Sequence, residues 1–273
     1  MYLPLNNNSE EFRTVTLQPG NFEDEVECLL NTVSAIDQLS NRYEALSYVW
    51  RSPESTTAIK LNGKTHQVTK NLESALRHLR YIKHPRVLWV DAISINQDDI
   101  EERNREVTRM GQIYSQAAGV DAWLGESFEN SNLALDAFGV FPTSMDVHWR
   151  PHENEALQNL VCDEATMDAL SKLFKRPWWH RMWIVQEATL AKNLTFVCGS
   201  RQITWDTFLV PAKCYQKHFG FCCNASVNVT WPIESLGHFF RPIVVISGSR
   251  SLHETMDIER LIPPFRGRIC TDP

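Results

Sequence analysis

The sequence predicts an α/β protein with an open, mainly parallel β-sheet that is flanked by helices and interrupted by insertions. Three short segments, 43–49, 87–91 and 120–124, have the apolar character of strands that are covered on both faces. Between these segments, apolar residues recur at helical spacing, so strands and helices alternate along the chain. This alternation is typical of sheets whose parallel strands are connected by helices, and we expect the three segments to be central strands.

The N-terminal region predicts one strand and one hairpin. Phe12–Leu17 alternates like a half-buried strand, and the polar stretch from Gly20 to the segment at 43–49 is expected to be a connection. Residues 59–61 and 66–68 flank Asn62-Gly63, and both residues of this pair accept a positive φ. We therefore expect two short strands to pair across this turn.

Two amphipathic helices and two strands follow. The first helix is predicted from Asn71 to Ile82, with Thr69 or Asn71 as its N-cap, and it ends before Pro85. Residues 86–93 are apolar enough for a strand that is buried on both faces. A second helix is predicted over 99–117, with Val107, Met110 and Tyr114 among its apolar residues, and 120–125 forms the next strand.

The second half of the chain is less regular. Residues 142–163 are rich in polar residues and proline, which predicts an insertion with a short helix at about 155–161. A helix is predicted over 165–175, and it must end near Arg176 because Pro177 disfavours helical geometry before it. We then expect a helix at 178–192, a strand at 194–198 and a helix at 205–217.

The composition excludes several classes of protein. Hydrophobic residues make up 43% of the 273 residues and charged residues 22%, as in folded globular domains. The formal charge is −6 and no basic run occurs, so we expect no nucleic-acid partner. The sequence has neither a secretory leader nor an apolar run of roughly 18 residues, so we expect no membrane span and a cytoplasmic location. The seven cysteines are scattered, which predicts free thiols.

Four ordered motifs resemble the fungal heterokaryon-incompatibility (HET) domain. The first is Tyr-Glu-Ala-Leu-Ser-Tyr-Val-Trp at 43–50, and the second is Val-Leu-Trp-Val-Asp-Ala-Ile-Ser-Ile-Asn-Gln at 87–97. The third runs from Glu102-Arg103 to Trp-Leu-Gly at 123–125, and the fourth is Arg-Met-Trp-Ile-Val-Gln-Glu at 181–187. Four motifs in order over about 145 residues are far more specific than any single pattern.

The resemblance implies one HET domain over 1–273, with a core at about 43–198 and a C-terminal extension at 199–273. The segment 267–273 resembles one that often follows the domain, so we expect the chain to be cut from a longer protein. Two residues depart from the family pattern. Arg51 stands where the family usually has Gly, and Ser94 stands where it often has Cys, which argues against a required thiol there.

HET domains are in turn similar to Toll/interleukin-1 receptor (TIR) domains, which implies a TIR-like open parallel sheet. Some TIR domains cleave NAD at its glycosidic bond with a Glu that lies four residues after a Trp, and Trp183 and Glu187 have this spacing. Residues at i and i+4 share a helix face, so Trp183 can partly desolvate Glu187, whose carboxylate would stabilise a ribosyl cation. The alternative is a structural role, in which Glu187 pairs with Arg181, Arg176 or Arg103.

Each of the other candidate site residues has both a functional and a structural interpretation. Asp91 follows a buried strand, so it either holds ribose hydroxyls or orients an Arg in a ligand crevice, or it caps the next helix, with Asn96 and Gln97 on the loop beyond. Arg103, with Glu102, either contacts a phosphate or belongs to a solvated helix face. Trp50 and Tyr48 either stack on a base or nicotinamide ring, or pack in the core.

The sequence predicts no metal site and no cofactor, and the resemblance to TIR domains implies NAD as a substrate. Cys214, His218, Cys222 and Cys223 are spaced poorly for tetrahedral zinc, and no hydrolase, zinc-protease or phosphate-loop motif occurs.

The resemblance implies a domain that triggers fungal programmed cell death after non-self recognition, through self-association and NAD cleavage. An upstream sensor or incompatibility partner protein would activate it. The alternative is a non-enzymatic signalling module that only self-associates. If the domain is an enzyme, Glu187 and Asp91 should reach a common cleft with Trp50 or Tyr48 at its edge.

Overall fold

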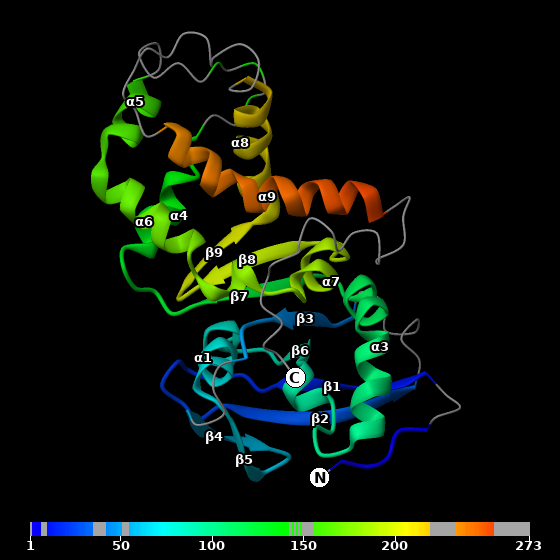
Figure 1. The fold of residues 1–273 in the computed structure, drawn as a ribbon. Coiled ribbons are helices and arrows are strands. Elements are labelled where there is room, and N and C mark those ends of the chain that lie inside the picture. The colour runs from blue at the N-terminus through cyan, green and yellow to red at the C-terminus, as the bar shows by residue number, and fades with distance from the viewer. Residues whose placement is uncertain are drawn as a thin grey trace.

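A single nine-stranded sheet, flanked by helices, organises the residues that the computed structural model describes (Figure 1). These residues are 2–6, 10–34, 42–50, 55–141, 144, 146, 148, 155–218 and 233–253. The strand order is β5-β4-β2-β1-β6-β3-β7-β8-β9, and the sheet is open because β5 and β9 lie at its two edges. The predicted α/β class is therefore confirmed.

The centre of the sheet consists of four parallel strands. They are β6 (Arg86–Trp89), β3 (Glu44–Ser47), β7 (Val120–Gly125) and β8 (Leu194–Cys198). β3 pairs in parallel with both β6 and β7, and β7 pairs in parallel with β8. The prediction that 43–49, 87–91 and 120–124 contain central strands is confirmed.

The two ends of the sheet are mixed rather than parallel. β1 (Glu11–Leu17) lies antiparallel between β2 (Glu27–Ser34) and β6. β2 pairs in parallel with β4 (Thr56–Leu61), which forms a hairpin with β5 (Lys64–Thr69). β9 (Arg201–Thr204) pairs antiparallel with β8.

The β4–β5 hairpin turns at the predicted dipeptide. Asn62 and Gly63 both have positive φ, 52° and 73°, as a tight two-residue hairpin requires. Helix α1 (Lys70–Leu79) follows directly, and the Thr69 side chain caps it by accepting a hydrogen bond from the Leu72 backbone N–H. Asp99 caps α3 (Ile100–Gln116) in the same way, by accepting from the Glu102 N–H.

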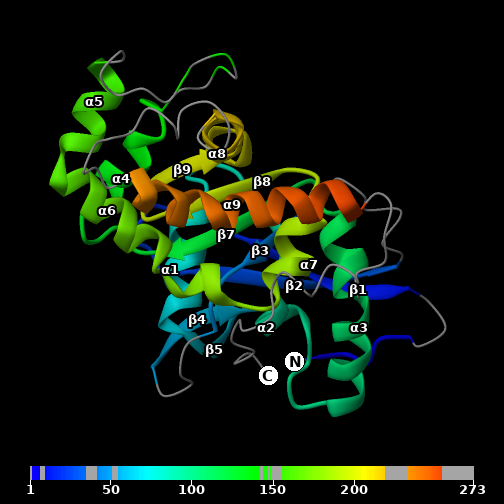
Figure 2. The ribbon, with the colours of Figure 1, turned by 45° about the horizontal axis from the view of Figure 1, so that its top comes forward.

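Further helices continue the chain. They are α2 (Asp91–Ser94), α4 (Ser131–Ala137), α5 (Glu155–Cys162), α6 (Glu164–Phe174), the 3-10 helix η3 (Pro177–His180), α7 (Ile184–Thr189), α8 (Trp205–His218) and α9 (Ile233–His253). Figure 1 shows α4, α5, α6, α8 and α9 grouped at the β9 end of the sheet. α9 packs against α7 and α8, and it runs across α8 (Figure 2). Among the described residues, no helix is both long and apolar enough to cross a bilayer.

Alternate residues of the central strands build two separate cores, one on each face of the sheet. Ala45, Trp89 and Ala122 belong to the core that also contains α3 and the helices at the β9 end. Their neighbours Leu46, Leu88 and Trp123 belong to a core with α1. Because successive side chains of a strand point to opposite faces, both faces must be apolar, which explains the continuous apolar segments of the sequence.

Three predicted elements need correction. The strand expected over 86–93 ends at Trp89, because Asp91 turns the chain into α2 and its Oδ1 accepts a hydrogen bond from the Ala92 N–H at 2.7 Å. The helix expected over 178–192 is divided into η3 and α7, because Arg181 between them is extended, with φ −75° and ψ 143°. The connection expected after Gly20 contains β2.

Candidate functional site

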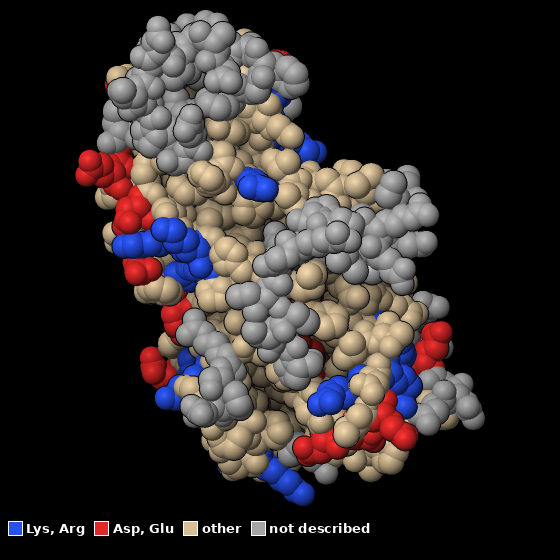
Figure 3. Space-filling model, viewed as in Figure 1, with Lys and Arg blue, Asp and Glu red and all other residues tan. Residues whose placement is uncertain are grey.

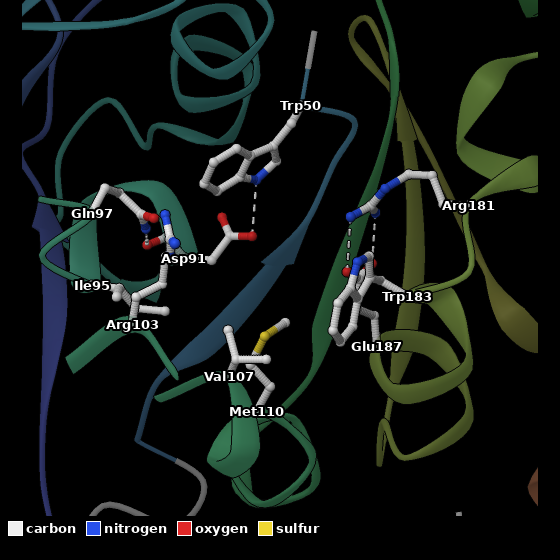
Figure 4. Close-up of a pocket in the computed structure, with 10 residues that line it drawn as sticks. All are labelled: Trp50, Asp91, Ile95, Gln97, Arg103, Val107, Met110, Arg181, Trp183 and Glu187. Atoms are coloured by element: carbon white, nitrogen blue, oxygen red, sulfur yellow. Dashed lines mark hydrogen bonds and ion pairs between the residues drawn. The ribbon is translucent and has the colours of Figure 1, made fainter. Parts of the chain in front are cut away.

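The strand-end pocket lies beyond the carboxyl ends of β3 and β6, between these strands, α3 and α7. Ten residues line it, and its cavity volume is about 30 Å³, with further space open to solvent at its mouth. They are Trp50, Asp91, Ile95, Gln97, Arg103, Val107, Met110, Arg181, Trp183 and Glu187 (Figure 4). Carboxyl ends of parallel strands are where open α/β sheets usually bind ligands.

Figure 4 shows how the walls of this pocket are arranged. Asp91 and Gln97 lie on one side with Arg103 of α3, and Arg181, Trp183 and Glu187 lie on the opposite side. Trp50 lies above the gap between the two groups in this view. Figure 3 shows basic and acidic side chains side by side on the surface around α3. The two carboxylates therefore belong to opposite walls of one pocket.

Glu187 is held in place by a network of buried hydrogen bonds. Both of its oxygens accept from Arg181, Oε2 from Nη1 at 2.8 Å and Oε1 from Nη2 at 3.0 Å. The hydroxyl of Ser47, at the end of β3, also donates to Oε2, and Trp178 Nε1 donates to the Ser47 oxygen at 2.8 Å. Glu187 is only 1% exposed, so this charge depends on Arg181 for compensation.

Asp91 is the second carboxylate of the pocket. Trp50 Nε1 donates to its Oδ2 at 2.9 Å, and the Tyr48 hydroxyl is also hydrogen-bonded to its side chain. Burial, with a smaller contribution from the negative charge of Glu187, raises the pKa of Asp91 to about 7, although Arg181 and the hydrogen bonds oppose the shift. At neutral pH, Asp91 is therefore close to the point at which it gains or loses a proton.

Two polar groups of the pocket have no partner among the described residues. Trp183 Nε1 is buried without a hydrogen-bond acceptor. The Arg103 side chain, which is half-buried, makes no hydrogen bond or ion pair to any part of the chain that the structure describes. A buried donor without an acceptor costs free energy, so Trp183 Nε1 is suited to a polar ligand, and the half-buried Arg103 guanidinium adds a positive charge to the same pocket.

Tyr48 and Asn96 were expected at the site but do not line the pocket. Tyr48 is 2% exposed and packs in the core on the α1 side of the sheet, where its ring stacks on Trp50. Asn96 lies on the loop after α2, where its backbone N–H donates to Glu102 Oε1 at 2.7 Å. Glu102 itself pairs with Arg13 and not with a ligand-facing group.

The pocket also contains residues that sequence reasoning did not assign to the site. Val107 and Met110 follow Arg103 at helical spacing, so one face of α3 supplies all three, and this periodicity was visible in the sequence. Ile95 has no such pattern. Gln97 reaches back to donate to the Asp91 carbonyl at 3.1 Å.

The remaining candidates lie elsewhere. Ser94 Oγ accepts a hydrogen bond from the Val90 N–H at 3.2 Å and does not line the pocket. Cys214 and His218 are buried on α8, whereas Cys222, Cys223 and Arg51 lie outside the described residues. No group of three or more potential metal ligands occurs within the described part of the chain.

Fold and pocket together define an α/β domain with a pocket at its strand ends. The chain belongs to the HET family, because the family model described as heterokaryon incompatibility protein (HET) matches residues 43–187. It is also 28% identical over 238 residues to heterokaryon incompatibility protein 6, OR allele, of Neurospora crassa. That match covers 73% of this chain and 35% of the relative. No solved structure matches, and the similarity to TIR domains stays a prediction.

Proposed function

We propose that this HET domain cleaves NAD at the bond between nicotinamide and ribose, and that this activity triggers cell death after non-self recognition. The observation that carries the proposal is the pairing of two buried carboxylates, Glu187 and Asp91, on opposite walls of a pocket that Trp50 and Trp183 also line. The name of the Neurospora relative supports the setting of heterokaryon incompatibility. Self-association and an upstream sensor or partner protein belong to the same proposal.

The proposed reaction needs only NAD and water. The bond between nicotinamide N1 and ribose C1′ breaks, and its electron pair returns to the pyridinium nitrogen, which becomes neutral. The positive charge that develops on the ribose is opposed by the Glu187 carboxylate, which acts most strongly in the transition state. Water then adds to C1′ and loses a proton, for which ionised Asp91 is the nearby acceptor. The products are nicotinamide, ADP-ribose and one proton.

The other polar groups of the pocket suit the remaining parts of this substrate. The indole rings of Trp50 and Trp183 offer flat surfaces to a nicotinamide ring. The unpartnered Trp183 Nε1 is a donor for a carboxamide oxygen, and the unpartnered Arg103 guanidinium is a donor for a phosphate. A ligand with an aromatic amide at one end and a phosphate at the other satisfies both groups.

A second function, a non-enzymatic module that assembles signalling complexes, is favoured by the Arg181–Glu187 ion pair. Its two short hydrogen bonds and the third from Ser47 occupy the carboxylate that would face the ribose. In that case Glu187 fixes α7 to the end of β3, and the strand-end pocket has no chemical role.

Incubation of the purified chain with NAD, followed by quantification of free nicotinamide, tests the enzymatic proposal. We expect nicotinamide release that scales with protein concentration and that is lost on Trp183→Ala. Because self-association is part of the proposal, the assay should be run over a range of protein concentrations. Absence of release at every concentration, from a chain with a cooperative thermal transition, would favour the non-enzymatic module.

A further inference from the structure

A second pocket lies on the other side of α7 and is chemically different from the strand-end pocket. This helix pocket is formed by the residues that end and follow α7, together with α8 and α9, and its cavity volume is about 450 Å³. Its polar lining includes Thr189, Lys192, Lys213, Ser247, Arg250 and Ser251. Of the described residues that line it, none is acidic.

Arg250 is the most buried of the cations in the helix pocket. Its guanidinium donates to two carbonyl oxygens, of Ala188 at 2.5 Å and of Lys192 at 3.4 Å, and it lies over the Trp205 ring at 5.8 Å. It has no ion pair with a carboxylate in the described part of the chain, although the negative charge of Asp206 is near enough to act on it. Carbonyl oxygens are dipoles and not full charges, so the positive charge of Arg250 is only partly compensated.

Thr189 provides an independent indication of a ligand. Its side chain is 3% exposed, it lines the helix pocket, and its hydroxyl has no hydrogen-bond partner among the described residues. A hydroxyl both donates and accepts, and leaving it unpaired when buried costs free energy. An oxygen-rich ligand would satisfy it.

We propose that the helix pocket binds a small anion that carries phosphate, such as a diphosphate or a nucleotide. Arg250 and Lys213 supply the positive charge, and Thr189 supplies a hydroxyl. Cations that converge in a pocket whose lining has no acidic residue favour a multiply charged oxyanion over a neutral ligand. The site also reaches the helix that carries Glu187, because Thr189 and Glu187 both belong to α7. An anion bound there therefore has direct contact with the helix that forms one wall of the strand-end pocket.

Calorimetric titration of the full chain with inorganic pyrophosphate, at constant ionic strength, tests this proposal. Lys213→Glu is the informative variant because Lys213 is exposed and makes no hydrogen bond or ion pair to the described residues, so the fold should not depend on it. We expect at least tenfold weaker pyrophosphate binding in this variant. Lys64→Glu is the matched control, since Lys64 is an exposed residue of β5, at the opposite edge of the sheet, and the charge change is identical.

Parallel titrations with inorganic phosphate and with ADP distinguish the source of the anion. Tighter binding of ADP that still depends on Lys213 identifies a nucleotide, whereas equal binding of all three probes identifies a general phosphate site. The proposal is overturned if the native chain binds none of them, or if Lys213→Glu and Lys64→Glu weaken binding equally. These measurements do not involve nicotinamide release, so their failure is separate from failure of the proposed function.

Discussion

Replacing Glu187 by Gln should lower both the stability of the fold and the rate of nicotinamide release, and the structure gives the expected magnitude of each effect. Gln keeps the shape of the side chain but removes its charge, so Arg181, which is 4% exposed, loses the counterion that binds it at two points. Breaking one half of a buried ion pair costs about 3 to 5 kcal/mol. With a melting temperature that changes by roughly 2 to 4 °C per kcal/mol in chains of this size, we expect a loss of roughly 10 °C.

The expected effect on turnover is separate from this loss of stability. A single electrostatic contact to a developing charge is worth about 3 to 4 kcal/mol, which corresponds to a decrease of roughly a hundred- to a thousandfold in rate. Nicotinamide release should therefore fall by this factor at a temperature where the variant is still folded. The assay consists of thermal unfolding and nicotinamide quantification on the same preparation.

Glu102→Gln is the matched control for Glu187→Gln. Glu102 is also buried and forms a two-point ion pair, with Arg13 at 2.6 and 3.0 Å, but it does not line the strand-end pocket. Both variants should lose similar stability, and only Glu187→Gln should lose turnover. The double variant Arg181→Gln, Glu187→Gln removes both charges. Its melting temperature should be higher than that of Glu187→Gln alone, but its activity should be no higher. Undiminished turnover in Glu187→Gln would refute its catalytic role, and an unchanged melting temperature would refute the ion-pair reasoning.

Other perturbations test the remaining structural arguments. Burial raises the pKa of Asp91 to about 7, so its ionisation disfavours the folded state, and this destabilisation grows as the pH rises from about 4 towards 7. Asp91→Asn should therefore raise the melting temperature more at pH 8 than at pH 5. An equal gain at both pH values would contradict the pKa shift. Gly199→Ala should destabilise by at least about 2 kcal/mol more than Gly63→Ala in urea unfolding. Both glycines have positive φ, but only at Gly199 would the new Cβ meet Ser127, at 2.6 Å, and equal losses would contradict this contact. Thr69→Ala should cost about 1 kcal/mol, because it removes the N-cap of α1, and urea unfolding without a measurable change would argue against that cap.

The parallel centre of the sheet could be predicted because burial on both faces leaves a continuous apolar run in the sequence. β2 could not be predicted in this way. Among the β2 residues whose burial the structure describes, only Cys28 is fully buried, and Leu29 is 39% exposed, which obscures the alternation. The break between η3 and α7 was also not predicted. It depends on Arg181, whose extended backbone precedes the turn that brings Glu187 and Arg181 together, and local helix propensity carries no information about such a tertiary ion pair.

Most of the residues that the motif resemblance assigned to the site line one pocket, and the absence of Tyr48 from the lining has a simple geometric cause. Trp50, Asp91, Arg103, Trp183 and Glu187 all line the strand-end pocket.

Tyr48 does not, because side chains of a strand alternate between faces. Ser47 reaches Glu187 on one face, so its neighbour Tyr48 must enter the core on the other. The sequence offers three arginines, Arg181, Arg176 and Arg103, as ion-pair partners of Glu187. Only the folded chain distinguishes Arg181 from Arg176, which binds carbonyl oxygens of Leu124 and Glu126 instead.

The position of β1 separates the segment defined by family similarity from the unit that can fold. The matched segment begins at residue 43, yet β1 lies between β6 and β2 and is the link through which β2, β4 and β5 join the central strands. A chain trimmed to 43–187 would expose the backbone edge of β6, detach the β4–β5 hairpin from its neighbour and remove β8 from β7. Expression boundaries taken from the match alone would therefore produce an aggregating fragment, and loss of activity in such a fragment would carry no information about the strand-end pocket.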